Sequence, residues 1–262
     1  MTTLTMGTRA PALGTLARRE AWRMVRHPVY LLLLVYFVLI GGVETADIGL
    51  PSRETARSFL VTFGLVFFGS ATFFAVNLVA SSARRARAES QLAAAPITPQ
   101  ARTLATCLGV LGPAAVATGF AAALWLVERV GTDLPRAQGP AELAVIPLCA
   151  LGGGLLGVAA ARWVPWPGAP LIVMVSLVAW VVAVMNHGEL RWTAPWTLSP
   201  GYHDDVLLAA GSQSWHAVYL LGLTLLAGVA ALLYHRSNRR PLLAVGALLW
   251  VGTLAACWAQ LP

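Results

Sequence analysis

The stretch LAVIPLCALGGGLLGVAAA at residues 143–161 decides the fold, because it runs for 19 residues without Asp, Glu, Arg or His. About 20 residues of α-helix cross the roughly 30 Å hydrocarbon core of a bilayer. Similar apolar stretches lie on both sides of it. The predicted spans are residues 28–43, 58–83, 103–127, 143–161, 168–186, 215–234 and 241–260.

The composition agrees with membrane spans and argues against buried helices of a soluble protein. Only 11% of the 262 residues are charged and 58% are apolar, whereas soluble domains carry about 25% charged residues. The sequence therefore predicts an all-α integral membrane protein, a single domain in which six to seven transmembrane helices form a polytopic bundle. The number stays open because residues 241–262 form either a full span or a re-entrant or interfacial segment.

Every one of the 18 basic residues is an arginine, and the chain contains no lysine. A Schiff-base lysine, a pyridoxal-phosphate anchor and a phosphate-binding loop that ends in Gly-Lys-Ser/Thr are therefore excluded. We expect no enzymatic activity, catalytic residue or cofactor in this chain. Cys107, Cys149 and Cys257 lie inside apolar stretches, and we interpret them as small core residues without a disulfide or a metal.

The distribution of charge predicts the orientation. With the N-terminus in the cytoplasm, seven spans place 13 arginines and two acidic residues inside, against five arginines and nine acidic residues outside. Basic residues concentrate in short cytoplasmic loops of membrane proteins. We therefore expect a multi-pass protein of the cell membrane, and the net charge of +7 needs no nucleic acid to explain it. The arginine-only, Ala- and Leu-rich composition suggests a GC-rich bacterial genome and hence a bacterial inner membrane.

Residues 13–27 form an amphipathic segment before the first span. Its apolar residues recur at helical spacing, and its arginines can reach an anionic inner leaflet. We predict an interfacial helix here, although the segment can also be read as a basic flank of the first span. The polar and aromatic residues assigned to this helix are Arg18, Arg19, Glu20, Trp22, Arg23 and Arg26.

The longest inner loop spans residues 84–102. Residues 86–95 are rich in helix formers, and Pro96 and Pro99 then end the helix. A plain tether would need only about 4–6 residues. The loop therefore predicts a short docking helix across the cytoplasmic end of the bundle, with Leu92 as its apolar contact.

The outer loop, residues 187–214, is rich in aromatic residues and proline. Such a sequence is typical of short interfacial or re-entrant helices whose Trp and Tyr side chains lie at the membrane surface. A metal site is the weaker reading, because no spacing puts a histidine and a carboxylate on one helix face. The residues that such a site would use are His187, Glu189, His203, Asp204 and Asp205.

The predicted spans contain almost no ionisable residues, whereas proton-coupled carriers place such residues at mid-membrane. Asn77, Thr118, Ser176 and Thr224 supply the few polar groups, and hydroxyls of this kind mostly bond back to their own helix. Glycines at 152–154 and 157 give a small-xxx-small spacing that permits close helix contact. We interpret them as packing residues.

Three segments resemble the membrane subunit of ATP-binding-cassette (ABC) exporters of the second type. They are LARREAWRMVRHP at residues 16–28, AESQLAAAPITPQAR at 88–102 and WTLSPGYH at 196–203. The first is similar to the interfacial helix of that family, the second to its coupling helix and the third to the outer loop before its final span. The chain departs from the family pattern by lacking the usual glycine after Glu89 and by having a seventh predicted span.

The resemblance implies an exporter powered by another polypeptide. Two copies of the chain, or this chain with a related permease, would form the pathway. Two separate cytoplasmic ABC ATPase subunits would bind ATP and Mg²⁺, grip the coupling helix and tilt the spans on closure. The resemblance implies docking contacts at Glu89, Gln91 and Leu92, with Arg84, Arg85 and Arg87 supporting them or holding lipid headgroups; its outer-loop residues are Trp196, Pro200 and Tyr202.

The low charge of the spans favours an apolar or amphiphilic substrate over a small ion. Three alternatives stay open. The chain can be a stand-alone secondary transporter, which would be driven by an ion gradient. It can be a membrane-embedded enzyme, which would turn over substrate as a single purified chain, or an assembly scaffold, which would bind partners and do neither.

Overall fold

The structure is a computed structural model that describes residues 9–32, 35, 36, 39, 53–87, 97–131, 140–185, 187–195, 212–235 and 239–261. Every main element that it describes is a helix. These helices are α1 (Arg9–Val25), α3 (Arg53–Ala80), α4 (Ser82–Arg85), α6 (Pro99–Gly109), α7 (Leu111–Gly131), α8 (Pro140–Trp163), α9 (Ala169–Met185), the 3-10 helix η2 (Gly188–Thr193), α10 (Gln213–Leu233) and α11 (Arg239–Ala259). The predicted all-α class is therefore confirmed.

Four of the described helical stretches are long and apolar enough to cross a bilayer. They are Pro99–Leu126, Pro140–Trp163, Gln213–Leu233 and Arg239–Ala259. Shorter apolar helices cover Val66–Ala80 and Ala169–Val184. The chain is thus built as a helical membrane protein, and a total of six to seven spans stays a prediction.

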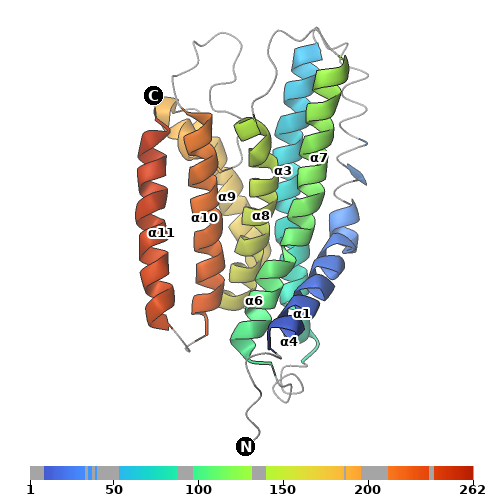
Figure 1. The fold of residues 1–262 in the computed structure, drawn as a ribbon, viewed down its shortest axis with the longest axis vertical. Helices are drawn as coiled ribbons and strands as arrows, with labels where there is room; N and C mark the ends of the chain where they lie inside the picture. The colour runs from blue at the N-terminus through green and yellow to red at the C-terminus, as the bar shows by residue number, and fades with distance from the viewer. Residues whose placement is uncertain are drawn as a thin grey trace, which may run out of the picture.

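The long helices stand side by side in a bundle (Figure 1). α11 and α10 lie at one side, α8 in the middle and α3 and α7 at the other side, while α1 is inclined against the lower part of the bundle. α1 lies at one end of the bundle, and α11 ends at the other. The long helices alternate in direction, so several helix ends meet at the end of the bundle that carries α1. These are α4, the start of α6, the C-terminal ends of α8 and α10, and the start of α11.

α8 is the central helix and contacts α3, α6, α7, α9 and α10. Its glycines let α3 approach to backbone distance. A Cβ added at Gly153 would lie 2.2 Å from the carbonyl oxygen of Gly69, and one at Gly157 would lie 2.6 Å from that of Phe73. The packing interpretation of the glycines is confirmed, because the backbones meet where a larger side chain has no room.

The predicted span over residues 103–127 lies within the helical stretch Pro99–Leu126, which Val110 divides into α6 and α7. α6 ends at Gly109 and α7 begins at Leu111, and at the break the Val110 amide donates to the Cys107 carbonyl at 3.2 Å, as in a 3-10 turn. Pro113 follows within one turn. A proline has no amide hydrogen and its ring clashes with the carbonyl four residues earlier, so Pro113 explains the break.

Of the polar residues in the predicted spans, Thr118 bonds as expected and Asn77 does not. Thr118 Oγ1 donates to the Ala114 carbonyl of its own helix at 2.9 Å. Asn77 instead donates from Nδ2 to the Gly157 carbonyl at 3.1 Å and so joins α3 to α8. The three cysteines are free, with Cys107 and Cys149 buried and Cys257 half-buried, and their burial agrees with a role as small packing residues.

Candidate functional site

α1 lies against the α6–α7 break through two glycines. A Cβ at Gly109 would meet the Cβ of Glu20 at 3.0 Å, and one at Gly112 would meet the Cβ of Ala21 at 2.9 Å. Met24 of α1 and Val110 at the break are fully buried in the same apolar cluster. α1 is therefore packed into the bundle on one face, and it begins at Arg9 and ends at Val25 instead of covering 13–27.

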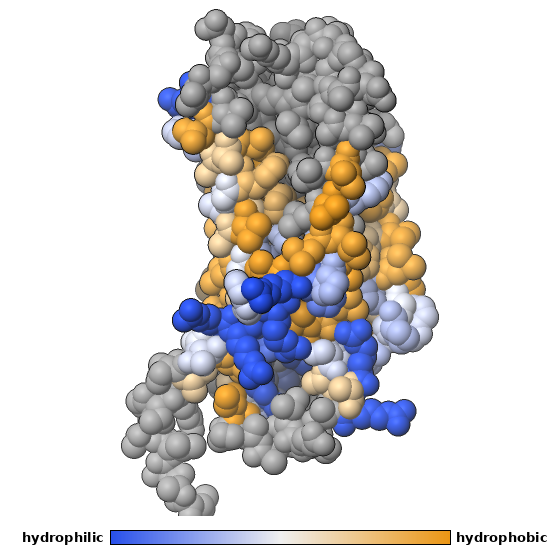
Figure 2. Space-filling view, turned by 90° about the vertical axis from the view of Figure 1, so that its right-hand side faces the viewer, coloured by the Kyte–Doolittle hydropathy of each residue, from blue (hydrophilic) through white to orange (hydrophobic). Residues whose placement is uncertain are grey.

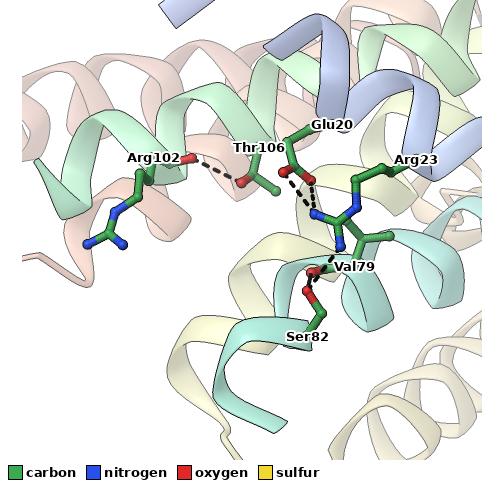
Figure 3. A network of polar contacts seen from close by, with 6 residues as sticks. All are labelled: Glu20, Arg23, Val79, Ser82, Arg102 and Thr106. Carbon is green, nitrogen blue, oxygen red and sulfur yellow. Dashed lines mark hydrogen bonds and ion pairs between the residues drawn. The ribbon is translucent and has the colours of Figure 1, made fainter. Parts of the chain in front are cut away.

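A polar contact ties α1 to the end of α3 and to α4 (Figure 3). Arg23 Nη1 lies 3.0 Å from Glu20 Oε1, and Arg23 Nη2 donates to the Ser82 hydroxyl oxygen at 3.4 Å. Ser82 in turn donates to the Val79 carbonyl at 2.7 Å. Arg23 and Glu20 thus connect three elements, which the sequence prediction of a lipid-facing arginine did not anticipate.

The other predicted residues of the interfacial helix lie on its exposed face. Arg18, Arg19, Trp22 and Arg26 are exposed. The guanidinium of Arg26 stacks 4.1 Å above the centre of the Trp22 ring, a cation–π arrangement. An amphipathic helix with one packed face and one face of arginine and tryptophan suits a membrane surface.

Three of the six predicted docking residues lie in the described part of the chain. Arg84 donates from Nη1 to the Ala161 carbonyl at 3.1 Å, and Arg85 donates to the Leu78 carbonyl. Both guanidinium groups therefore fold back onto the bundle. Glu89, Gln91 and Leu92 lie outside the described residues.

The helix predicted over residues 86–95 does not begin at Ala86. α4 ends at Arg85, residues 86 and 87 form a turn, and Arg87 has a φ of 52°. A residue in this left-handed region ends a helix. Residues 88–95 lie outside the described part.

A cavity of about 350 Å³ lies where Arg84 and Arg85 fold back. We call it the α4 cavity. Polar groups line one part of it and the turn between α8 and α9 lines the other. The lining residues are Asn77, Leu78, Ser81, Arg84, Arg85, Ala161, Val164, Pro165, Trp166, Pro167 and Pro170.

Cations gather at this end of the bundle, which we call the basic end. Figure 2, which faces the side that carries α1, shows hydrophilic side chains toward that end and an apolar surface above them. The basic residues are Arg18, Arg19, Arg23, Arg26, Arg84, Arg85, Arg87, Arg102, Arg162, Arg239 and Arg240.

Two histidines at the basic end have lowered pKa values, first because they are buried and then because arginines lie near them. Burial, and then the charges of Arg85 and Arg23, hold the pKa of His27 below its ordinary value of 6.5. Burial, and then Arg162 and Arg102, lower the pKa of His235 in the same way. Burial and the neighbouring positive charges both disfavour the protonated form of each imidazole.

A second cavity, of about 220 Å³, lies between α8, α9 and α10. Its lining is almost wholly apolar, and the glycines of α8 form part of its wall. The residues around it are Leu148, Cys149, Gly152, Gly153, Leu156, Leu177, Pro195, Leu220, Leu223, Thr224 and Ala227.

The opposite end of the bundle holds a buried network that the sequence did not reveal. His216 Nδ1 lies 2.9 Å from Gln260 Oε1, and Gln260 Nε2 donates to the Trp192 carbonyl at 2.8 Å. All three side chains are buried. The only sequence signal was the position of His216 and Gln260 at the ends of two apolar runs, which also suits exposed residues.

The outer loop is described only in part. It contains η2, whose Trp192 is buried in the protein and not at its surface, whereas Trp196, Pro200 and Tyr202 lie outside the described residues. The prediction of short interfacial helices stays a prediction. Of the residues weighed for a metal, His187 is exposed. In the described part no three His, Cys, Asp or Glu side chains come together as metal ligands.

Comparison with protein families, with curated proteins and with solved structures finds no match for this chain. The arrangement itself offers two features for function. One is a basic end at which α4 and α6 flank the inner loop and both contact α1, and the other is an apolar cavity inside the bundle.

Proposed function

We propose that the chain is the membrane subunit of an ABC exporter of the second type. The observation that carries the proposal is the set of contacts around the inner loop. The chain leaves the described part at Arg87 and returns at Ile97, and both flanks join α1, through the Arg23–Ser82 bond on one side and the α1–α6 contact on the other. A partner that moves this loop would therefore act on three connected helices.

α6 is suited to carry such a movement into the bundle. It begins at Pro99, where the Thr98 hydroxyl oxygen accepts a hydrogen bond from the Ala101 amide at 3.2 Å, so its first turn is capped. α6 contacts α1, α8 and α10, and the break at Val110 separates it from α7. In this proposal α6 tilts about the break as the ATPases close.

The proposed topology has six to seven spans, in which the segment 28–43, α3 and α9 join the four long apolar stretches. The N-terminus is cytoplasmic, because the basic end would then face the cytoplasm as the positive-inside rule favours. The chain would lie in a bacterial inner membrane. Its last segment would be either a span or an interfacial helix.

Two cytoplasmic ABC ATPase subunits are the proposed partners, together with a second copy of the chain or a related permease. The absence of lysine from the sequence supports a separate source of energy, since the phosphate-binding loop needs one. ATP and Mg²⁺ would be bound by the ATPases, which would dock on Glu89, Gln91 and Leu92. The apolar cavity between α8 and α10 supports an apolar or amphiphilic substrate.

The test is to search the neighbouring reading frames for an ABC ATPase and to co-express that ATPase with the chain, followed by purification in mild detergent and reconstitution. We expect the two proteins to purify together and the vesicles to transport an amphiphilic dye only with ATP. Leu92→Arg should abolish transport and stimulated ATP hydrolysis, while Ala12→Arg on the exposed face of α1 should leave both unchanged.

Three results would overturn the proposal. Transport that an ionophore stops and that needs no ATPase would make the chain a secondary transporter. Turnover of a substrate by the purified chain alone would make it an enzyme. Stable partners without transport or turnover would make it a scaffold.

A further inference from the structure

The α4 cavity combines two cations with an apolar wall. Arg84 and Arg85 line one part of it, while Val164, Pro165 and Pro167 from the turn after α8 line another. Its volume of about 350 Å³ is that of a small-molecule site. A ligand that fills it would need an anionic group on one side and an apolar portion on the other.

The guanidinium groups are already held in position. Arg84 bonds to the Ala161 carbonyl of α8, and Arg85 bonds to the Leu78 carbonyl of α3. Each guanidinium carries five N–H donors in a rigid fork, and such forks match the oxygens of a phosphate. An anion that binds here would therefore meet donors whose side-chain freedom has already been reduced.

Arginines outnumber carboxylates at the basic end within the described part of the chain. Glu20 is the one described carboxylate at the basic end, and it pairs with Arg23. Arg162 interacts electrostatically with Arg84 and Arg102, and its buried Nε has no hydrogen-bond partner among the described residues. Like charges this close repel unless an anion lies between or beside them.

The cavity lies at the level where a membrane surface would be. It is at the C-terminal end of α8, a helix long and apolar enough to span a bilayer. Trp163 and Trp166 at this level are 52% and 56% exposed, and tryptophan is enriched at the headgroup level of membranes. A free anion would use the arginines but would leave the apolar wall, which includes Trp166, without a contact.

We propose that the α4 cavity binds an anionic phospholipid, with Arg84 and Arg85 holding its phosphate and the prolines of the α8–α9 turn packing on its glycerol and upper acyl carbons. Basic pockets between helices on the cytoplasmic side suit such headgroups. This assignment does not depend on the transport function, because it concerns a lipid and needs no ATPase.

The test uses native mass spectrometry of the full chain released from mild detergent after incubation with phosphatidylglycerol. We expect a bound lipid to remain on the wild type. Removing one arginine (Arg84→Gln or Arg85→Gln) should weaken the affinity about fivefold, and removing both should weaken it about thirtyfold. Arg18→Gln with Arg19→Gln, which removes the same charge from the exposed face of α1, should retain the lipid.

Ser81→Phe provides a second variant that fills the cavity and keeps both arginines. It should also lose the lipid, and size-exclusion chromatography and thermal unfolding would verify that each variant is folded. Three results would overturn the proposal. The Arg18/Arg19 control could lose the lipid equally, the wild type could retain phosphatidylcholine with the same acyl chains equally well, or Ser81→Phe could retain the lipid. Displacement of the lipid by inorganic phosphate at equal concentration would also overturn it, because the ligand would then be a free anion.

Discussion

α8 and α11 are similar in length and hydropathy but differ in their surroundings. Both are long apolar helices that can cross a bilayer, yet 67% of the apolar window of α8 is buried inside the molecule against 11% for α11. α8 contacts α3, α6, α7, α9 and α10, whereas the main contact of α11 is with α10. Hydropathy therefore identifies both helices, but it does not tell a helix covered by protein from one whose surface is left for lipid or for a second subunit.

The difference lies in the small residues. Gly153 and Gly157 of α8 face the backbone of α3, while a Cβ at Gly252 of α11 would meet nothing within 4 Å. In lipid, where no hydrophobic effect drives helices together, close packing of small residues takes its place. A glycine can thus be replaced by a larger residue in α11 but not at these positions of α8.

The strongest test of this contrast is Gly153→Ala. The added methyl group would overlap the Gly69 carbonyl oxygen at 2.2 Å, so α3 and α8 must separate, and we expect the free energy of unfolding to fall by about 3 kcal/mol. Gly252→Ala should leave it unchanged or raise it by up to about 1 kcal/mol, because alanine favours a helix. Thermal unfolding in mild detergent would measure both, and equal effects would contradict the assignment of α8 as the central helix.

A second test concerns the one described polar network that holds the end of α11. Gln260→Leu would remove the bonds to His216 and Trp192 and leave a buried ring nitrogen without its partner. We expect a loss of about 2 kcal/mol in the free energy of unfolding. Trp258→Leu, at a neighbouring position that is 80% exposed, is the matched control and should change little. If Gln260→Leu left the free energy of unfolding unchanged, α11 would be held by its apolar contacts alone.

A smaller effect is expected from acid. His27 and His235 have pKa values below 6.5 in the folded chain, so the unfolded chain binds protons more readily than the folded chain as the pH falls below 6.5. The free energy of unfolding should therefore decrease as the pH falls from 6.5 to the pKa values of the folded chain, and this contribution should level off below them. Melting temperatures measured above and below pH 6.5 would detect the decrease, and His27→Gln with His235→Gln should reduce it. An unchanged slope in this double variant would refute the role of the two histidines.

The smallest effect should come from the outer face of α11. Leu248 is 75% exposed, and Leu248→Ala should change the free energy of unfolding by less than about 0.5 kcal/mol. Ile146→Ala in α8, where the side chain is fully buried, should be clearly more destabilising. A large effect of Leu248→Ala would mean that a second subunit covers this face.

Much of the fold could be predicted from the sequence, because an uncharged apolar run of about 20 residues is as long as a bilayer-spanning helix and longer than most buried helices. The apolar runs predicted the helices, the prolines at 165 and 167 separated α8 from α9, and the glycines of α8 indicated close packing. The break at Val110 was not predicted, although Pro113 was a usable signal for it. A proline near the start of an apolar run is also compatible with an unbroken span, so hydropathy alone does not reveal such a break.

The site was less predictable, because it depends on which helix ends meet. Nothing local to Glu20 and Arg23 indicates that they join α1 to Ser82, and the loop position of Arg84 and Arg85 suggested contacts away from the bundle. The direction of a long side chain is decided by carbonyls from other helices. Such carbonyls become available only when the helices have packed.

The packing of α1 against the α6–α7 break has a consequence for biosynthesis. Gly109 and Gly112, against which Glu20 and Ala21 rest, leave the ribosome long after residues 9–25 have been made. Until then the amphipathic segment lies on the bilayer surface, where its exposed arginines and Trp22 contact the headgroups. Its final position is thus reached only after later segments have been inserted, and a nascent chain arrested before Gly109 should leave this segment open to added protease.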